Sequence, residues 1–165
     1  TKGEWAMLVA LISILVYIGF RFEFLYGIGA ILALIHDVLI TVGIFSILQL
    51  QFDLSVLSAL LAVIGYSLND TIVVYDRIRE NANLMYSDKP ENILNKSINQ
   101  TLSRTLITSL TTLFVLFSLL IFGGIAVEYF AIAMIIGVLV GTFSSIYIAG
   151  ASLYFLKVLE SSGEK

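Results

Sequence analysis

Cysteine is absent from the 165 residues of this sequence, and proline and histidine occur once each. The absence of cysteine excludes disulfide bonds and thiolate metal sites, and the single histidine, His36, leaves little for a histidine-based metal site. No glycine-rich loop with a lysine is present, which argues against a nucleotide-driven machine, and no basic run suggests nucleic acid. We therefore expect no metal ion, no organic cofactor and no nucleic-acid partner.

Charge is also scarce, since 13% of the residues are charged and 59% are hydrophobic. The mean hydropathy is +0.99. A soluble domain carries about 25% charged residues, whereas a helix that spans a bilayer needs about 20 apolar residues in succession. The sequence therefore predicts an all-α membrane protein, a polytopic bundle of five transmembrane helices in one domain over residues 1–165. The expected spans are residues 5–20, 24–50, 56–75, 101–122 and 127–156.

The one sustained polar stretch lies between the third and fourth spans and forms a predicted cytoplasmic loop over residues 77–100. Asp88-Lys89-Pro90-Glu91 is a helix-start pattern, because proline is tolerated in the first turn of a helix. Ile93, Leu94, Ile98 and Leu102 then share one face. We expect a short surface helix here that lies on the membrane or on neighbouring helices.

Basic residues indicate the orientation of the predicted spans. Eight of the nine lysines and arginines fall on one side of the membrane, and only Lys2 falls on the other. The side rich in lysine and arginine faces the cytoplasm, so we expect a cytoplasmic C-terminus and an N-terminus on the outer, periplasmic side. The chain begins with Thr1 and has no signal-peptide pattern, from which we expect a missing upstream helix.

Ionisable side chains occur inside three of the apolar spans, where a charge costs about 2.5 to 3.5 kcal/mol. These are the pair His36 and Asp37, the pair Asn69 and Asp70, and Arg104. The short turn around Asp53 makes the second and third spans an antiparallel hairpin. Equal counting from Asp53 places both aspartates level, about 24 Å below the turn at 1.5 Å per residue. A similar count from Phe122 puts Arg104 near the same layer.

This layer has two interpretations. A carboxylic acid away from water favours its neutral form and a nearby guanidinium favours the ionised form, so Asp70 and Arg104 are candidates for a proton-relay site. Ser67 lies one turn from Asp70, and Thr108, Thr111 and Thr112 share a helix face with Arg104. Alternatively, these groups form a static polar network that holds the helices together. An intramembrane aspartyl protease is disfavoured, because no Gly-x-Gly-Asp motif is present.

Small residues recur every four positions in the fifth span. This pattern lets helix backbones approach closely, and we interpret it as a packing surface. Its members are Gly137, Gly141, Ser145 and Ala149.

The third span carries the sequence VIGYSLNDTIVVYDRIREN over residues 63–81. It resembles the signature of the SecF family, membrane subunits of the bacterial SecDF protein translocase accessory complex. Three further stretches resemble the family in the same order: RFEF at 21–24, ALIHDVLIT at 33–41 and SRTLITS at 103–109. Together they cover roughly residues 20 to 157. The resemblance implies an RND-type transmembrane half, with the present chain corresponding to the second to sixth of six helices and without the periplasmic domain.

The resemblance also implies a function, a location and partners. It implies a subunit of the Sec machinery in the bacterial inner membrane that uses the proton-motive force to assist protein export, without covalent chemistry and with protons as the coupling ion. The implied partners are SecD, SecYEG, YajC, the translocating polypeptide and membrane lipid, with YidC as a further candidate. It assigns proton transport to Asp70 and Arg104, whereas His36, Asp37, Asn69, Ser67, Thr108 and Thr112 are expected to form a supporting polar network. The alternatives are a passive scaffold for SecD or SecYEG and an RND-type exporter of small molecules or lipids.

Overall fold

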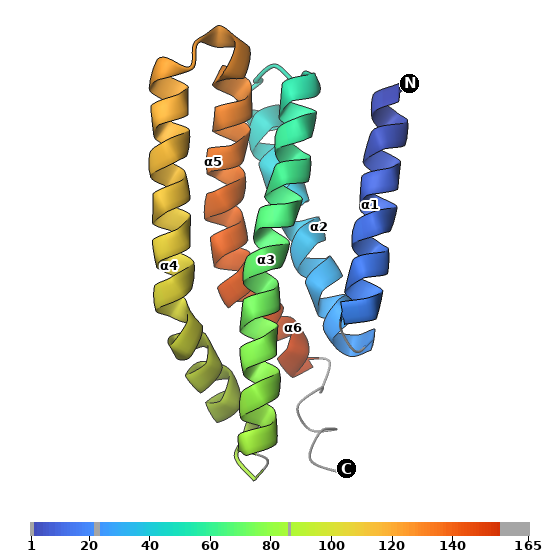
Figure 1. Cartoon of the computed structure of the whole chain (residues 1–165), viewed down its shortest axis with the longest axis vertical. Coiled ribbons are helices and arrows are strands. Elements are labelled where there is room, and N and C mark those ends of the chain that lie inside the picture. The colour runs from blue at the N-terminus through green and yellow to red at the C-terminus, as the bar shows by residue number, and fades with distance from the viewer. Residues whose placement is uncertain (1, 22–23, 86, 156–165) are drawn as a thin grey trace.

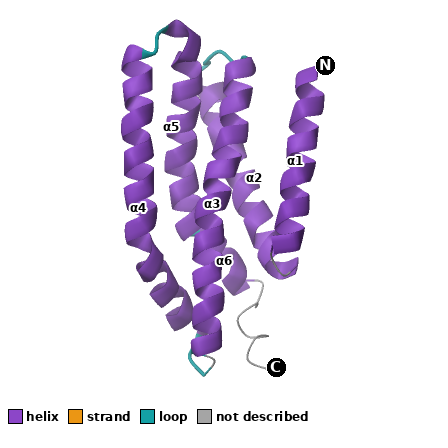
Figure 2. Ribbon diagram, in the orientation of Figure 1, coloured by secondary structure: helices purple, strands orange, loops and turns teal. Residues whose placement is uncertain are grey.

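The computed structural model describes residues 2–21, 24–85 and 87–155, and every regular element within these ranges is an α-helix (Figures 1 and 2). The all-α class predicted from the sequence is therefore confirmed. Leu156, the predicted end of the fifth span, the C-terminal tail and part of the RFEF motif lie outside the described residues. The helices are α1 Lys2–Arg21, α2 Phe24–Ile47, α3 Leu54–Leu84, α4 Pro90–Phe122, α5 Ile125–Ile146 and α6 Ile148–Phe155.

Four segments are long and apolar enough to cross a membrane: Leu25–Ile47, Leu54–Leu84, Pro90–Phe122 and Ile125–Phe155. Helix α1 covers the first predicted span but is not one of these four. The chain is thus a multi-pass membrane protein, and the first predicted span, residues 5–20, remains a prediction.

The helix boundaries in the polar stretch, residues 77–100, differ from the prediction. Helix α3 continues nine residues beyond Tyr75, to Leu84, and α4 runs without interruption from Pro90 to Phe122. The expected surface helix is therefore the first part of the fourth span rather than a separate element. Asn81 of α3 explains this continuity in part, because its Nδ2 donates to Ser97 Oγ at 2.8 Å and to Gln100 Oε1 at 2.9 Å. These bonds hold the polar ends of α3 and α4 against each other.

The predicted fifth span is divided into α5 and α6 at Tyr147. The backbone N–H of Tyr147 still donates to the Phe143 carbonyl at 3.0 Å, so the interruption is confined to one residue. It changes the direction of the chain enough for α6 to pack against the lower part of α2 and α3 (Figure 1).

Chain direction alternates from α1 to α5, and α6 continues in the direction of α5 (Figure 1). The connections 48–53 and 123–124 lie together at the end that carries the N-terminus. Asp53 caps α3 at this end, where its Oδ1 accepts from the backbone N–H groups of Ser55 at 2.9 Å and Val56 at 3.0 Å. A hydrogen bond from the Ser55 hydroxyl, followed by these backbone bonds, lowers the pKa of the Asp53 carboxyl. Such a cap satisfies N–H groups that the first helical turn leaves free.

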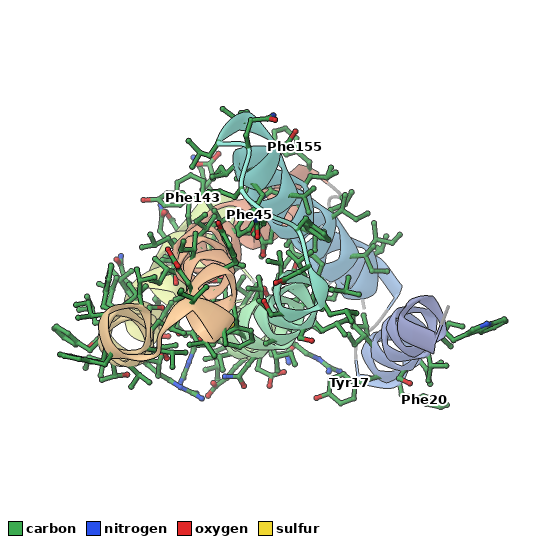
Figure 3. All side chains as sticks on the ribbon, turned by 90° about the horizontal axis from the view of Figure 1, so that it is seen from above. Tyr17, Phe20, Phe45, Phe143 and Phe155 are labelled. Carbon is green, nitrogen blue, oxygen red and sulfur yellow. The ribbon has the colours of Figure 1, made fainter. Side chains whose placement is uncertain are left out.

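Two apolar clusters form the core. One surrounds Tyr75 and Ile78 and joins α1, α2, α3, α4 and α6, and the other surrounds Val63 and Val138 and joins α2, α3, α4 and α5. Polar side chains are also buried, and they come from α2, α3, α4 and α5. Among them are Asp37, Ser67, Asp70, Thr71, Thr105, Ser109 and Ser145. Large apolar side chains elsewhere point outward around the bundle, including the labelled Tyr17, Phe20, Phe143 and Phe155 (Figure 3). An apolar outer surface suits a bundle surrounded by lipid.

Candidate functional site

Asp37 of α2 is fully buried, and both of its carboxylate oxygens have partners. The Ser67 hydroxyl of α3 donates to Oδ2, and His36 Nδ1 lies 3.0 Å from Oδ1. The His36 side chain is 27% exposed, so it joins the buried carboxylate to the edge of the bundle. A buried carboxylate with two partners is a satisfied polar group, and it links α2 directly to α3.

Asp70 lies one helical turn beyond Ser67 on α3, and its carboxyl group is less completely hydrogen-bonded than that of Asp37. Its side chain is only 5% exposed, yet Oδ2 has no hydrogen-bond partner among the described residues. Thr105 Oγ1 of α4 is buried and unpartnered in the same sense. An unpaired buried polar atom costs about 1 to 3 kcal/mol, so such a group in a native protein calls for a functional explanation.

Arg104 precedes Thr105 on α4, and its charge is close enough to act on the Asp70 carboxyl. The two residues do not form an ion pair within 4 Å in the described part of the chain. Arg104 is exposed and lines a cavity between α3 and α4. The structure therefore places the predicted relay residues on neighbouring helices, with electrostatic contact but without a direct bond.

Counting residues in the sequence predicts the depth of Asp37 to within about one helical turn. Asp37 was expected to lie level with Asp70, whereas its hydrogen-bond partner is Ser67, one turn nearer to the connection. Equal counting treats the turn as a point at Asp53. In the structure residues 48–53 are all outside the helices, and five of these six residues precede Asp53. The levels on α3 are therefore shifted toward its start.

The other predicted network residues make no bond to Asp70. Asn69 is exposed on the outer face of α3. Thr108 donates to the Arg104 carbonyl at 3.0 Å, and Thr112 donates to the Thr108 carbonyl at 2.8 Å. These two threonine hydroxyls donate to carbonyl groups of their own helix rather than to a facing helix.

The predicted packing residues lie on α5 and α6. A side-chain carbon at Gly137 would collide with Val63 of α3, and one at Gly141 would lie 3.1 Å from Ser67 Cβ. Ser145 is buried, and its hydroxyl donates to the Thr142 carbonyl at 3.0 Å. Ala149 is buried on α6. Close approach of α5 to α3 thus depends on the two glycines, and it also fixes the position of Ser67.

Sequence reasoning missed a second polar chain across three helices. Tyr66 of α3 donates to Ser109 of α4 at 3.3 Å, and Ser109 Oγ lies 2.6 Å from Thr142 Oγ1 of α5. The sequence contains a signal for this chain, because Thr101, Thr105 and Ser109 recur every four residues; in the structure all three are buried.

Among the described residues no group of histidine, cysteine, aspartate and glutamate side chains could hold a metal ion.

Comparison with known proteins relates the chain to one family, both by a family model and by individual relatives. The family model described as "Protein export membrane protein SecD/SecF, C-terminal" matches residues 1–158. Proteins named protein translocase subunit SecF are similar over most of the chain. That of Calditerrivibrio nitroreducens is 54% identical over 160 residues, covering 96% of this chain and 53% of the relative. That of Vibrio alginolyticus is 56% identical over 149 residues, covering 90% of this chain and 47% of the relative.

Solved structures agree with these sequence matches. A crystal structure of SecDF from Thermus thermophilus, described as a translocon-associated membrane protein, superposes with a TM-score of 0.89 at 47% identity. The match covers 96% of this chain and 22% of the SecDF chain. A second SecDF structure, in a super-membrane-facing form, gives a TM-score of 0.86 at the same identity. The present chain spans about half the length of the SecF relatives that it matches.

Proposed function

The chain belongs to the SecD/SecF family of protein export membrane proteins, and on that premise we propose that it is a proton-coupled membrane subunit of the Sec protein translocation machinery. The proposal is that it assists export of polypeptides across the bacterial inner membrane and draws its energy from the proton-motive force. Protons are the coupling ion, and the mechanism needs no organic cofactor and no covalent chemistry.

One observation carries the proposal: the buried, unpartnered carboxyl oxygen of Asp70 beside the charge of Arg104. A carboxyl oxygen without a hydrogen-bond partner can bind a proton without losing a partner, and a guanidinium nearby offsets the negative charge when the proton leaves. Asp70 is thus the residue that loads and releases protons, and Arg104 is its charge partner. Asp37 and His36 have a supporting role, since the Asp37 carboxylate already has partners.

The outer face of α3 favours contact with a partner subunit, which we propose to be SecD. Ala62, Gly65 and Asn69 recur at intervals of three and four residues and are exposed. A side-chain carbon at Gly65 would meet nothing within 4 Å, so its own chain does not require a glycine there. An asparagine facing lipid is costly, and a partner helix that supplies a hydrogen bond removes that cost. SecYEG, YajC and YidC are proposed as further partners, together with the translocating polypeptide.

The orientation proposed from the basic residues places the 85–89 connection and the C-terminus in the cytoplasm. The N-terminus and the 48–53 and 123–124 connections then face the periplasm, at the same end as one another in Figure 1. Arg77 and Arg104 lie toward the cytoplasmic end of α3 and α4 in this orientation.

The decisive experiment is Asp70→Asn in the full-length subunit assembled with its partners. Asparagine keeps the size of the side chain but cannot ionise. We expect the complex to assemble and to lose the part of polypeptide translocation that depends on the proton gradient, measured with inner-membrane vesicles with and without an uncoupler. Asp88→Asn, the same chemical change in the exposed connection, is the matched control and should keep full activity.

The same experiment separates the alternatives. Full gradient-dependent translocation by Asp70→Asn would leave the passive scaffold as the better description. The exporter alternative predicts proton-driven efflux of small molecules or lipids by the isolated complex, which we do not expect. The SecF signature and its relatives favour protein export instead.

A further inference from the structure

The end of α2 that leads into the 48–53 connection carries a pocket. Its volume is about 320 Å³, toward the lower end of the range of about 300 to 1,000 Å³ that ligand pockets cover. The lining residues all belong to the last turns of α2 and to the connection: Val42, Phe45, Ser46, Gln49, Leu50 and Phe52. Since no other described helix contributes to the lining, a ligand can reach the pocket from the side of the bundle.

The backbone turn at Gln49 shapes this pocket. Gln49 has a φ of +51 degrees, a left-handed conformation that glycine adopts readily and other residues adopt at a cost. The Gln49 N–H donates to the Ser46 carbonyl at 3.2 Å. The Leu50 N–H donates to the Phe45 carbonyl at 3.0 Å, and the two bonds form a Schellman cap. The chain then folds back so that the ring of Phe52 meets that of Phe45 edge to face, with 6.4 Å between centroids.

The pocket combines an apolar floor with polar groups. Phe45 is buried, whereas Ser46 and Gln49 are exposed. Gln49 Nε2 donates to the Ser46 carbonyl at 2.8 Å, and a primary amide has a second N–H and an acceptor oxygen besides. A ligand with an apolar part and hydrogen-bonding oxygens therefore fits this pocket better than a purely apolar one.

The charge next to the pocket is negative. Asp53 directly follows Phe52 and is exposed, and a hydrogen bond from the Ser55 hydroxyl, followed by that from the Val56 N–H, lowers the pKa of its carboxyl. The basic residues between positions 24 and 155 all lie on the cytoplasmic side of this bundle as we orient it: Arg77, Arg79, Lys89, Lys96 and Arg104. A cationic group is therefore attracted to this end of α2, and an anionic group is repelled.

The pocket lies at the boundary of the apolar layer. The dense run of charges on α3 begins at Asp76, and Leu54 to Tyr75 spans about 33 Å at 1.5 Å per residue, close to the hydrocarbon thickness of about 30 Å. The connection before Leu54 is therefore level with the headgroups, of the outer leaflet in the orientation proposed from the basic residues. An exposed apolar stripe of α2 continues from the pocket toward the membrane centre, with Val42, Leu39, Ile35 and Leu32.

We propose that this pocket binds one phospholipid of the outer leaflet whose headgroup ends in an ammonium group. One acyl chain occupies the pocket and continues along the exposed stripe of α2. The Ser46 hydroxyl and the Gln49 amide donate to the ester oxygens of the lipid, and the ammonium group lies beside the Asp53 carboxylate. The negative charge selects this headgroup over an anionic one, and the depth of the pocket favours a lipid over a segment of exported polypeptide.

Photo-labelling tests the site in the full-length subunit assembled with its partners. The complex is reconstituted in vesicles of phosphatidylethanolamine and phosphatidylglycerol in equal amounts, and a trace of one lipid or the other carries a diazirine on an acyl chain. Mass spectrometry then compares labelling at residues 42–52 with labelling around Val115, which is 68% exposed on the outward face of α4. We expect the ethanolamine probe to label the pocket about fivefold more than the glycerol probe, near the upper limit for one exposed ion pair, and both probes to label α4 equally.

Two other labelling patterns would overturn the proposal. Equal labelling of the pocket by both probes would mean that it contacts boundary lipid without selecting a headgroup. Labelling of α4 without labelling of the pocket would mean that protein covers it, either a partner or the exported polypeptide. Asp70→Asn should leave the labelling unchanged, so the lipid site is tested independently of the proposed proton site.

Two variants test the assigned roles. Asp53→Asn removes the charge but keeps a residue that caps helices well, and we expect the preference for the ethanolamine probe to disappear. Glu128→Gln, which removes a charge from the first turn of α5 at the same end, is the matched control and should keep the preference. Val42→Trp narrows the pocket and should lower its labelling while labelling of α4 is unchanged. A preference that survives Asp53→Asn, or pocket labelling that survives Val42→Trp, would refute the site.

Discussion

Helix α3 has two unlike neighbourhoods. Toward α2 and α5 it is closely packed, with Gly137 and Gly141 against Val63 and Ser67 and with the Asp37 carboxylate satisfied at both oxygens. Around Asp70 and α4, two buried oxygens are unpartnered and a polar cavity separates part of the helices. The first neighbourhood resembles a fixed scaffold. The second leaves a buried carboxyl oxygen without a partner among the described residues, at a cost in stability.

The largest effect on stability is expected from Gly137→Leu. Overpacking a close helix contact forces backbone shifts that cost typically 1 to 3 kcal/mol, and we expect about 3 kcal/mol here, because the new side chain meets Val63 directly. The measurement is the free energy of unfolding in detergent. Gly65→Leu is the matched control, because a side chain at Gly65 meets nothing within 4 Å in its own chain. Similar destabilisation by both variants would contradict the close packing of α3 on α5.

A smaller effect is expected from Ser67→Ala. The change removes the hydroxyl that donates to Asp37 and leaves a buried carboxylate oxygen unpaired. Hydrogen bonds between membrane helices contribute about 0.6 kcal/mol on average, and an unpaired charged group adds to this, so we expect a loss of about 1 to 2 kcal/mol. Thermal unfolding of the purified subunit measures it. An unchanged midpoint would show that Asp37 does not hold α2 to α3.

The smallest effect is expected from Thr105→Val on the other side of α3. Thr105 Oγ1 has no partner to lose among the described residues, and valine has nearly the same shape. Replacing an unsatisfied hydroxyl with a methyl group should therefore change the free energy of unfolding by less than about 0.5 kcal/mol, or stabilise the chain slightly. A loss as large as that of Ser67→Ala would mean that Thr105 has a partner in the assembled protein and that the two neighbourhoods are alike.

Some features were determined by the sequence alone. Apolar runs of spanning length predicted the all-α membrane fold, since no other backbone arrangement except a closed barrel satisfies its hydrogen bonds in lipid. The motif around Asp70 indicated the family that the comparisons support. The same sequence reasoning divided α4 into a surface helix and a span, because polarity is a poor guide to where a helix ends when a neighbouring helix satisfies the polar side chains.

The tertiary structure decided which polar groups are paired. Residue counting placed Asp37, Asp70 and Arg104 in one layer, yet it could not show that Asp37 bonds to Ser67 while Asp70 Oδ2 remains unpartnered. Helical periodicity gives the face and the approximate depth of a residue, but a hydrogen bond also depends on how neighbouring helices are rotated and how closely they approach. Here the contact of Gly141 with Ser67 sets that approach, and it separates the Asp37 carboxylate, which is bonded to Ser67, from the Asp70 carboxyl group, whose Oδ2 has no partner among the described residues.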